Sequence, residues 1–382
     1  MGSNNMNKWL ADWTKRAYPD SKRDLCTRFI ERGQNLSIDR GYEALITSDT
    51  CMYISSFEQL RKNILSRSTI VCFIDTRGTN AHPDVFDANA GWVLHNTFVE
   101  GMKGSYFKLN QAIAAKEAGY LEALANPDCS WRYRAEANQF ELIPGNPIAY
   151  WASNSMIKAF ESFPCLQDFA TPRQGLATSN NSRFLRKWWE VSTSNTDRKC
   201  RSHEEALECG ARWFPIIRGG AYQKWFGVYD EVVDWADNGR EMKAEVLRKY
   251  TYLNTPDFVI KNQADYFKPA VTWSKISSGD ISFRYAPAGM LFEVAGACMF
   301  AEEDTLCAIQ AFCNSSIALE ALSFLAPTLN YEIGQISILP ISEAVFEMKE
   351  SLCEIVGENR ILTQIDLSKE ECSPEFKKHP LV

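Results

Sequence analysis

The chain has 382 residues, a net charge of −7, 45% hydrophobic residues and 23% charged residues. This is the composition of a folded globular protein, and its acidic balance excludes a histone-like protein that coats nucleic acid with cations. Its length is too great for one ordinary core and indicates two or three domains, or one split architecture. No apolar run reaches the roughly 18 residues that a membrane helix needs, so we expect a cytoplasmic protein without membrane contact.

The first third of the chain alternates predicted helices with predicted strands. Apolar spacing predicts helix from Asn7 to Gly33, broken by a turn at Tyr18-Pro19-Asp20 and stopping at Gly33, and again over Ser56–Leu65. Alternating helices and strands are typical of a parallel-rich sheet, here with about three strands and an antiparallel edge. The predicted strands are Gly41–Thr47, which we expect to be buried, Thr69–Asp75, and Gly91–Glu100, which we expect to pair with Tyr106–Leu109.

The loop after the second predicted strand carries polar residues where open α/β sheets present ligands. Asp75, Arg77 and His82 lie in or beside it. An unrelated catalytic centre at these residues is one reading, but no spacing there specifies a reaction.

In the rest of the chain, the sequence predicts an amphipathic helix over Gln111–Ala125, and the composition changes after it. Turns at Asn126-Pro127-Asp128 and Pro144-Gly145 place a domain boundary near Ile143–Pro147. Strands and turns are expected to dominate beyond it. The later predicted elements are an edge strand over Lys268–Ile276, a helix over Ala308–Leu325, a closing strand over Tyr331–Pro340 and a helix over Ala344–Val356.

A basic, amide-rich stretch, Thr171–Val191, stands out in the second half. From Thr171 to Phe226 there are ten Lys or Arg against five Asp or Glu, so this part carries about +5 and the remainder about −12. A basic island in an acidic protein favours a focused polyanion site. Arg, Asn and Gln can contact base edges, and Arg and Lys pair with phosphates.

Two readings of this island remain open. Its cations can equally form the solvated face of a half-buried strand, with Trp188 and Trp189 in the core or a groove wall, and Asn180 and Asn181 can hold a turn. From Cys209 to Tyr229, cations alternate with aromatic residues around a glycine pair. This arrangement suits a nucleic-acid groove, and it suits a carbohydrate or protein contact nearly as well.

The twelve cysteines are scattered, form no C-x-x-C pair and follow no signal peptide, so we expect reduced thiols. Cys200, His203 and Cys209 are three metal-ligand types in one segment. They lack a fourth ligand at a usual spacing, and we predict no metal site.

Several stretches resemble the large adenine-specific DNA methyltransferases of BREX-type phage-defence systems. They are DLCTRFIERG, FLRKWWEV, KWFGVYDEVVDW, TWSKISSG, FRYAPAG and PTLNYEIGQISILPI. The family transfers a methyl group from S-adenosylmethionine to N6 of a flipped adenine, using an Asn-Pro-Pro-Tyr motif and a glycine-rich cofactor loop. This sequence has no Pro-Pro dipeptide and no strand followed by such a loop.

The resemblance therefore implies a fragment that begins just after the catalytic motif. The implied fold class is α/β: the C-terminal half of a Rossmann-like methyltransferase sheet (1–110), a helical connector (111–146), a mixed α+β target-recognition domain (147–342) and a C-terminal segment (343–382). The implied partners are double-stranded DNA and the missing catalytic half. S-adenosylmethionine would serve the intact enzyme, with no cofactor or catalytic residue in this chain. The residues predicted to contact DNA are Arg173, Gln174, Thr178, Asn180, Asn181, Arg183, Arg186, Lys187, Arg218, Lys224 and Lys275.

A second hypothesis, from a different class of function, is that the chain is a protein-interaction module. Its aromatic surface would dock another defence-system subunit, or the absent half of the sheet, without binding DNA. The acidic remainder of the chain supports this alternative, because its bulk charge disfavours DNA.

Overall fold

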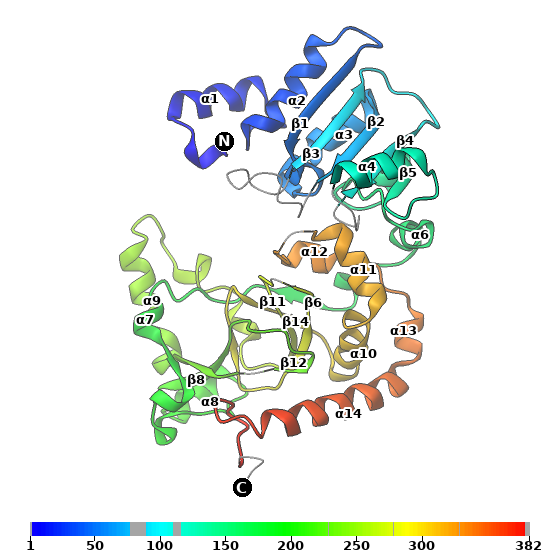
Figure 1. Cartoon of the computed structure of the whole chain (residues 1–382). Helices are drawn as coiled ribbons and strands as arrows, with labels where there is room; N and C mark the ends of the chain where they lie inside the picture. The colour runs from blue at the N-terminus through cyan, green and yellow to red at the C-terminus, as the bar shows by residue number, and fades with distance from the viewer. Residues whose placement is uncertain are drawn as a thin grey trace. The chain divides into compact units, whose positions relative to one another are not determined.

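The computed structural model describes residues 2–76, 89–109, 116–227, 229–277, 279–327 and 329–378. The chain divides into two compact units, Met1–Ser162 (unit 1) and Phe163–Val382 (unit 2) (Figure 1). The boundary that the sequence places near Ile143–Pro147 lies inside unit 1.

Unit 1 is built on a five-stranded sheet with the order β1-β3-β2-β4-β5. β3 is antiparallel to both of its neighbours, β2 is parallel to β4, and β4 is antiparallel to β5. The expectation of a parallel-rich, three-stranded sheet was therefore wrong. The expected pairing of β3 with Tyr106–Leu109 was also wrong, because β4 lies beside β2; periodicity finds strands but does not assign their partners. The strands are β1 (Tyr42–Ser48), β2 (Thr69–Asp75), β3 (Asn89–His95), β4 (Lys103–Lys108) and β5 (Arg132–Glu136).

Helices cover one face of this sheet and part of the other. Ile30 of α2 and Ile64 of α3 pack with Phe73 and Trp92 in the main core of unit 1, while Ala123 of α4 packs with Phe107 on the opposite face. The described helices are α1 (Lys8–Ala17), α2 (Leu25–Leu36), α3 (Glu58–Arg67), α4 (Lys116–Ala125), α5 (Ala137–Glu141) and α6 (Asn154–Ser162).

Gly33 does not stop α2, which continues to Leu36. A Cβ on Gly33 would lie 1.9 Å from Oε1 of Glu43, so a side chain there would displace the Glu43 carboxylate. The expected helix stop is therefore a glycine inside α2, at the contact of this helix with β1.

β1 lies at the edge of the sheet, and its expected full burial was wrong. Tyr42 and Ile46 are 67% and 83% exposed. They lie on the face of the sheet opposite the main core, which α4 covers only in part, and there Ala44, Ile46, Val93 and neighbouring residues line an apolar hollow of about 240 Å³. Within the described ranges, nothing pairs with the outer edge of β1.

The polar loop after β2 lies mostly beyond the described ranges, and so do Arg77 and His82. Asp75 is buried at the end of β2, where its Oδ2 accepts a hydrogen bond of 3.0 Å from the Tyr150 hydroxyl.

Unit 2 contains two sheets, a four-stranded one with the order β13-β8-β10-β7 and a five-stranded one with the order β6-β14-β11-β12-β9. The expected edge strand at Lys268–Ile276 is β11, which is buried along its length and lies centrally, so its predicted edge position was wrong. The strands are β6 (Thr171–Arg173), β7 (Leu185–Lys187), β8 (Trp213–Ile217), β9 (Trp225–Phe226), β10 (Glu231–Asp234), β11 (Ala270–Ser274), β12 (Phe283–Ala286), β13 (Leu291–Phe292) and β14 (Gly296–Phe300).

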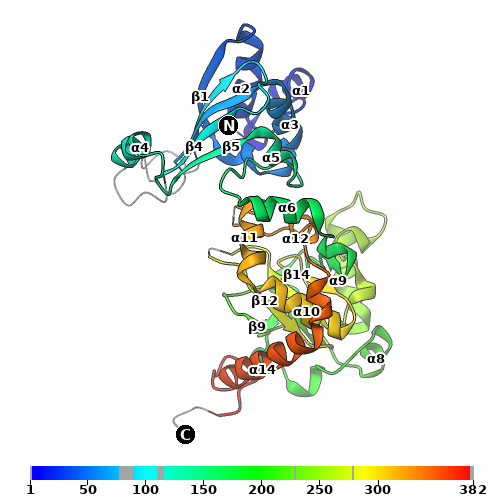
Figure 2. The same ribbon diagram turned by 90° about the vertical axis from the view of Figure 1, so that its right-hand side faces the viewer.

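Helices surround the two sheets, and α14 packs against α10 and β9 (Figure 2). The expected closing strand at 331–340 was wrong: Glu332 and Gln335 form a capping box there that starts helix α12. The helix expected over 308–325 is divided at Ser315, which caps the second part. The helices are α7 (Asn181–Phe184), α8 (His203–Glu208), α9 (Ala236–Lys249), α10 (Glu303–Cys313), α11 (Ser316–Leu325), α12 (Ile333–Ser337), α13 (Ala344–Glu347) and α14 (Lys349–Leu367).

None of the described helices is by itself long and apolar enough to cross a membrane. Among the described helices, α10 and α11 together meet that length and composition, as a pair bent by 73°.

Candidate nucleic-acid interface

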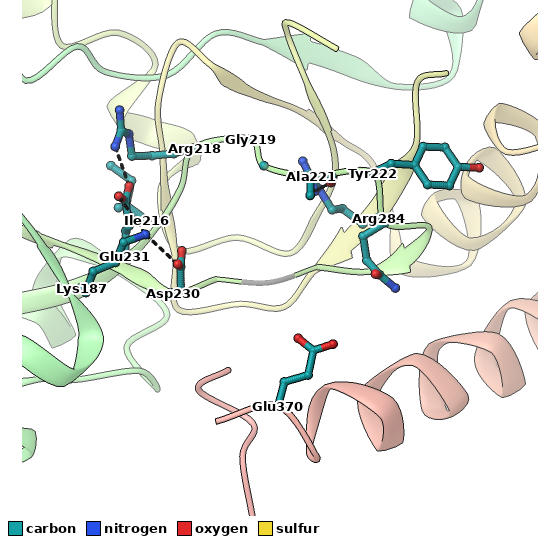
Figure 3. Close-up of a pocket in the computed structure, with 12 residues that line it drawn as sticks. Lys187, Ile216, Arg218, Gly219, Ala221, Tyr222, Asp230, Glu231, Arg284 and Glu370 are labelled. Carbon is teal, nitrogen blue, oxygen red and sulfur yellow. Dashed lines mark hydrogen bonds and ion pairs between the residues drawn. The ribbon is translucent and has the colours of Figure 1, made fainter. Parts of the chain in front are cut away.

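A pocket of about 580 Å³ in unit 2 brings together the two parts of the chain that the sequence marks as basic and aromatic. Lys187 enters from β7, and Arg218 and the loop Gly219–Gln223 follow β8 (Figure 3). Arg284 of β12 lies behind the loop, and Glu370 approaches from the turn after α14. Lys187 and Arg218 are the predicted DNA contacts that share this pocket.

Carboxylates hold both of these cations. Lys187 Nζ lies 2.6 Å from Asp230 and 3.3 Å from Glu231, and Arg218 lies 2.6 Å from Glu231 and 2.5 Å from Glu293. Burial opposes the positive charges, but the hydrogen bonds and charges of these acids outweigh it and raise the pKa of Lys187 and of Arg218. The charges of this wall of the pocket are therefore largely cancelled.

A glycine turn forms the opposite wall. Gly219 has φ +82°, and a Cβ there would lie 2.8 Å from the Ala295 carbonyl, so the position requires glycine. Buried Arg284 holds the loop: it donates to the Ala221 carbonyl at 3.2 Å and to the Ser274 hydroxyl at 2.5 Å. Burial lowers the pKa of Arg284. Both contacts are to uncharged groups, so this arginine orders the loop rather than neutralising an acid.

Tyr222 is presented by this ordered loop. Its side chain is 55% exposed, and it lines both the 580 Å³ pocket and a second hollow of about 530 Å³ that also includes Ile276 and Asp280. In Figure 3 its ring points away from the Lys187–Asp230 pair. An exposed aromatic side chain between two hollows can stack on a flat group.

The amide-rich loop is a structured turn. Asn180 caps α7, accepting hydrogen bonds from the Arg183 amide at 3.3 Å and the Ser182 hydroxyl at 2.9 Å. Thr178 is buried and donates to the side chain of Asn181, which is exposed. Asn180 and Thr178 therefore stabilise this turn through their hydrogen bonds.

The remaining predicted contacts each have a partner within the protein. Arg183 pairs with Glu241 of α9 at 2.7 Å and Glu245 at 3.4 Å. Arg186 folds back onto the carbonyls of Ser182 and Leu185 at 2.8 and 2.6 Å. The other partners are Asp265 for Arg173 (3.7 Å), Lys261 for Gln174 (3.4 Å), the Asn314 carbonyl for Lys224 (3.0 Å) and Glu332 for Lys275 (3.0 Å).

The structure thus brings Lys187 and Arg218 into one pocket and distributes the other predicted residues over separate neighbourhoods. Sequence reasoning did not select Arg284, Tyr222 or Glu370. Tyr222 lay within the aromatic and cationic pattern of 209–229, which is a weak pointer to it. Nothing in the local sequence marks Arg284, because its role depends on β12 lying behind the glycine turn.

The comparisons with known proteins cover both units. Residues 1–82 match the family model described as "Eco57I restriction-modification methylase". The chain is 35% identical to the adenine-specific methyltransferase PglX of Lacticaseibacillus casei (strain Zhang) over 361 residues, which is 92% of this chain and 30% of that protein. It is 29% identical to the adenine-specific methyltransferase BrxX of Escherichia coli O9:H4 (strain HS), over 100% of this chain and 30% of that protein. The chain therefore spans about a third of the length of these relatives.

A solved structure shares the fold. It is that of a nuclease-deletion mutant of the Type ISP restriction-modification enzyme LlaGI in complex with a DNA substrate mimic. The TM-score is 0.50 at 11% sequence identity, over 94% of this chain and 34% of that one. The likeness shows that the mixed α/β architecture also occurs in a restriction-modification enzyme.

Proposed function

We propose that this chain, which belongs to the family of the adenine-specific methyltransferases PglX and BrxX, is the part of such an enzyme that recognises duplex DNA. The observation that carries the proposal is the extent of the likeness to PglX. The chains are 35% identical over 92% of this chain, and the aligned region includes unit 2 as well as unit 1. Unit 2 is thus shared with a methyltransferase along with the sheet of unit 1.

In this proposal unit 1 is the distal part of the methyltransferase sheet. β1 and β2 both run antiparallel to β3, so they are parallel to one another, and α3 connects them. This is the arrangement of a crossover connection in an α/β sheet. The outer edge of β1, with Tyr42 and Ile46 exposed, is where a further strand of the sheet would pair. S-adenosylmethionine and the flipped adenine would then bind in the intact enzyme.

We expect no methyl transfer from this chain alone. The sequence has no Pro-Pro dipeptide and hence no Asn-Pro-Pro-Tyr motif. The measurement is transfer of tritium from labelled S-adenosylmethionine to unmethylated duplex DNA, with a complete adenine methyltransferase as the positive control. Incorporation above that of a boiled sample would contradict the assignment of catalysis to another segment.

Unit 2 would supply the DNA contacts, and its ion pairs differ in how readily they can give way to phosphates. The side chains of Arg183 and Glu241 are 48% and 57% exposed, and exposed pairs contribute only about 0–1 kcal/mol. Arg183 can therefore exchange Glu241 for a phosphate at small cost. Arg218 is held between Glu231 and the buried Glu293, so we assign it to the architecture of the pocket.

The double variant Arg183→Ala with Arg186→Ala tests phosphate contact. Each phosphate contact contributes about −0.9 to the slope of log K against log salt. Loss of two contacts is expected to make this slope shallower by about 2 and to weaken binding roughly tenfold or more at low salt. Fluorescence anisotropy with a labelled duplex at several salt concentrations measures both quantities.

Lys349→Ala is the matched control, because it removes an exposed cation of α14 that pairs only loosely with Asp304 at 3.7 Å. Its affinity and slope are expected to equal those of the unchanged chain. An unchanged slope in the double variant would remove these two arginines from the interface.

The second candidate function, a protein-docking module, is favoured by one observation. The cations of the island are paired with acids from elsewhere in unit 2, including Glu241, Asp230 and Glu293, and this neutralised surface suits protein better than a polyanion. Stable co-purification with another defence-system subunit, together with no measurable duplex binding at low salt, would select it.

A further inference from the structure

A thiol and carboxylate cluster in unit 2 contains none of the residues assigned to the proposed DNA surface. Asp197, Cys200 and Cys209 each offer one ligand atom, and these atoms lie within 4.8 Å of one another. The sulfurs of Cys200 and Cys209 are 3.6 Å apart. In the part of the chain that the structure describes, these three residues are the group whose spacing suits a metal ion.

The spacing fits tetrahedral zinc. With Zn–S distances of about 2.3 Å, two thiolates on adjacent corners of a tetrahedron are about 3.8 Å apart, close to the separation of the two sulfurs here. Thiolate and carboxylate are both established zinc ligands, and a water molecule can complete the four positions.

The backbone holds the ligands in place. Asp197 Oδ1 accepts hydrogen bonds from the amides of Lys199 at 2.6 Å and Cys200 at 2.9 Å, which turns the chain so that Asp197 and Cys200 converge. The Asp197 amide donates to the Trp213 carbonyl of β8 at 3.0 Å. Cys209 is fixed at the end of α8, where its amide donates to the Glu205 carbonyl at 2.9 Å.

His203, which the sequence groups with these cysteines, is directed elsewhere. Its Nδ1 lies 3.0 Å from Asn238 Oδ1 and its Nε2 lies 2.8 Å from the Gln263 carbonyl. Both ring nitrogens are therefore occupied, and Asp197 takes the place that spacing alone would give to the histidine.

We propose that Asp197, Cys200 and Cys209 bind one Zn²⁺ ion. Two thiolates and a carboxylate leave the complex with one negative charge, and Arg198, Lys199 and Arg201 surround it in sequence. The metal joins the loop before Cys200 to the end of α8 and, through Asp197, to β8. It thereby stabilises the sheet that carries Arg218, independently of whether unit 2 binds DNA.

The test uses the full chain, purified under reducing conditions, stripped with a chelator and titrated with Co²⁺ and then with Zn²⁺. One equivalent of Co²⁺ is expected to give the sulfur-to-metal charge-transfer band and the visible bands of a tetrahedral thiolate site, and Zn²⁺ is expected to displace it. Zn²⁺ is also expected to raise the Tm of unit 2, because it binds the folded state.

Cys209→Ser and Asp197→Asn are each expected to weaken Zn²⁺ binding at least tenfold. Cys372→Ser, which removes an exposed thiol outside the cluster, and His203→Gln are expected to keep the full stoichiometry. Circular dichroism establishes that each variant is folded, and Asp197→Asn keeps the test decisive if Cys209→Ser does not fold.

Three outcomes would overturn the proposal. They are the absence of stoichiometric Co²⁺ binding, a loss of binding in His203→Gln equal to that in Cys209→Ser, and formation of a Cys200–Cys209 disulfide in the presence of equimolar zinc. The last is detected as a mass decrease of about 2 Da that thiol reductant reverses.

Discussion

Arg61→Met is expected to lower the free energy of unfolding of unit 1 by about 3–5 kcal/mol, because it removes a buried charged group that hydrogen-bonds separate segments of the unit together. Arg61 is 1% exposed. It donates to the Gly145 carbonyl at 3.0 and 2.6 Å, to the Cys51 carbonyl at 2.8 Å and to the Ile54 carbonyl at 2.9 Å. Burial lowers its pKa to about 10, which still leaves it charged at neutral pH.

These bonds connect α3 to the segment 51–54 just before it and to the turn at Gly145, 84 residues away. Methionine fills similar volume but donates nothing, so the buried Cys51 carbonyl and the partly buried Gly145 and Ile54 carbonyls each lose a hydrogen bond. A buried acceptor left without a partner costs about 1–3 kcal/mol before relaxation. Arg61→Lys is expected to cost less, since an ammonium group still has three donors but cannot span both segments.

Hydrogen exchange with mass spectrometry measures this effect, because peptides from unit 1 report separately from those of unit 2. Protection in the core strands of unit 1 is expected to fall by at least about a hundredfold. Arg67→Met on the exposed face of the same helix is the control, with an expected change within about 0.5 kcal/mol. Equal effects of the two substitutions would show that Arg61 is not the structural link described.

The stability of unit 1 is expected to decrease by up to about 3 kcal/mol as the pH rises from about 4.5 to 7, because of Glu43. Both carboxylate oxygens of Glu43 are buried without a hydrogen-bond partner, against Gly33 of α2. Burial raises the pKa of this carboxyl to about 7 from an ordinary value of 4.5. The folded state therefore holds the proton that the unfolded chain releases first, and stability is greatest below the unfolded pKa.

Glu43→Gln keeps the shape of the side chain and removes the titration. At pH 8 it is expected to stabilise unit 1 by about 1–3 kcal/mol and to flatten the pH dependence. Urea unfolding at pH 5, 6, 7 and 8, followed by hydrogen exchange of peptides from α2 and β1, gives the comparison. Glu58→Gln, at an exposed carboxylate paired with Lys62, is the control. It is expected to leave the dependence of the unfolding free energy on pH unchanged. If Glu43→Gln also retained the wild-type slope, another group would be responsible.

The sequence allowed the first helices and strands to be located well. The strand Thr69–Asp75 was predicted with the bounds that the structure shows, and the turn at Tyr18-Pro19-Asp20 separates α1 from α2. Strand partners could not be predicted, because pairing joins residues through space: β2 lies between β3 and β4 in the sheet. The 331–340 segment was mistaken for a strand because its capping box, Glu332 with Gln335, was not recognised.

The charges of the candidate interface show a second limit of sequence reasoning. The segment Thr171–Phe226 has a local excess of cations, but Arg218 pairs with Glu293, 75 residues away, and Arg183 pairs with Glu241, 58 residues away. Counting charges along the chain cannot include such partners. The pocket lies at the segment where aromatic and basic residues alternate around Gly219 and Gly220, whereas nothing in the local sequence marks Arg284, which orders the loop.

The position of β1 affects how unit 1 behaves in concentrated solution. An edge strand of seven residues that carries an exposed tyrosine and an exposed isoleucine, and contains no proline, is a template on which the same strand of another molecule can assemble. Oligomers or fibrils that grow through β1 are the expected form of aggregation. A lysine at position 46 would place a charge on the most exposed apolar residue of the strand and act as a gatekeeper against such growth.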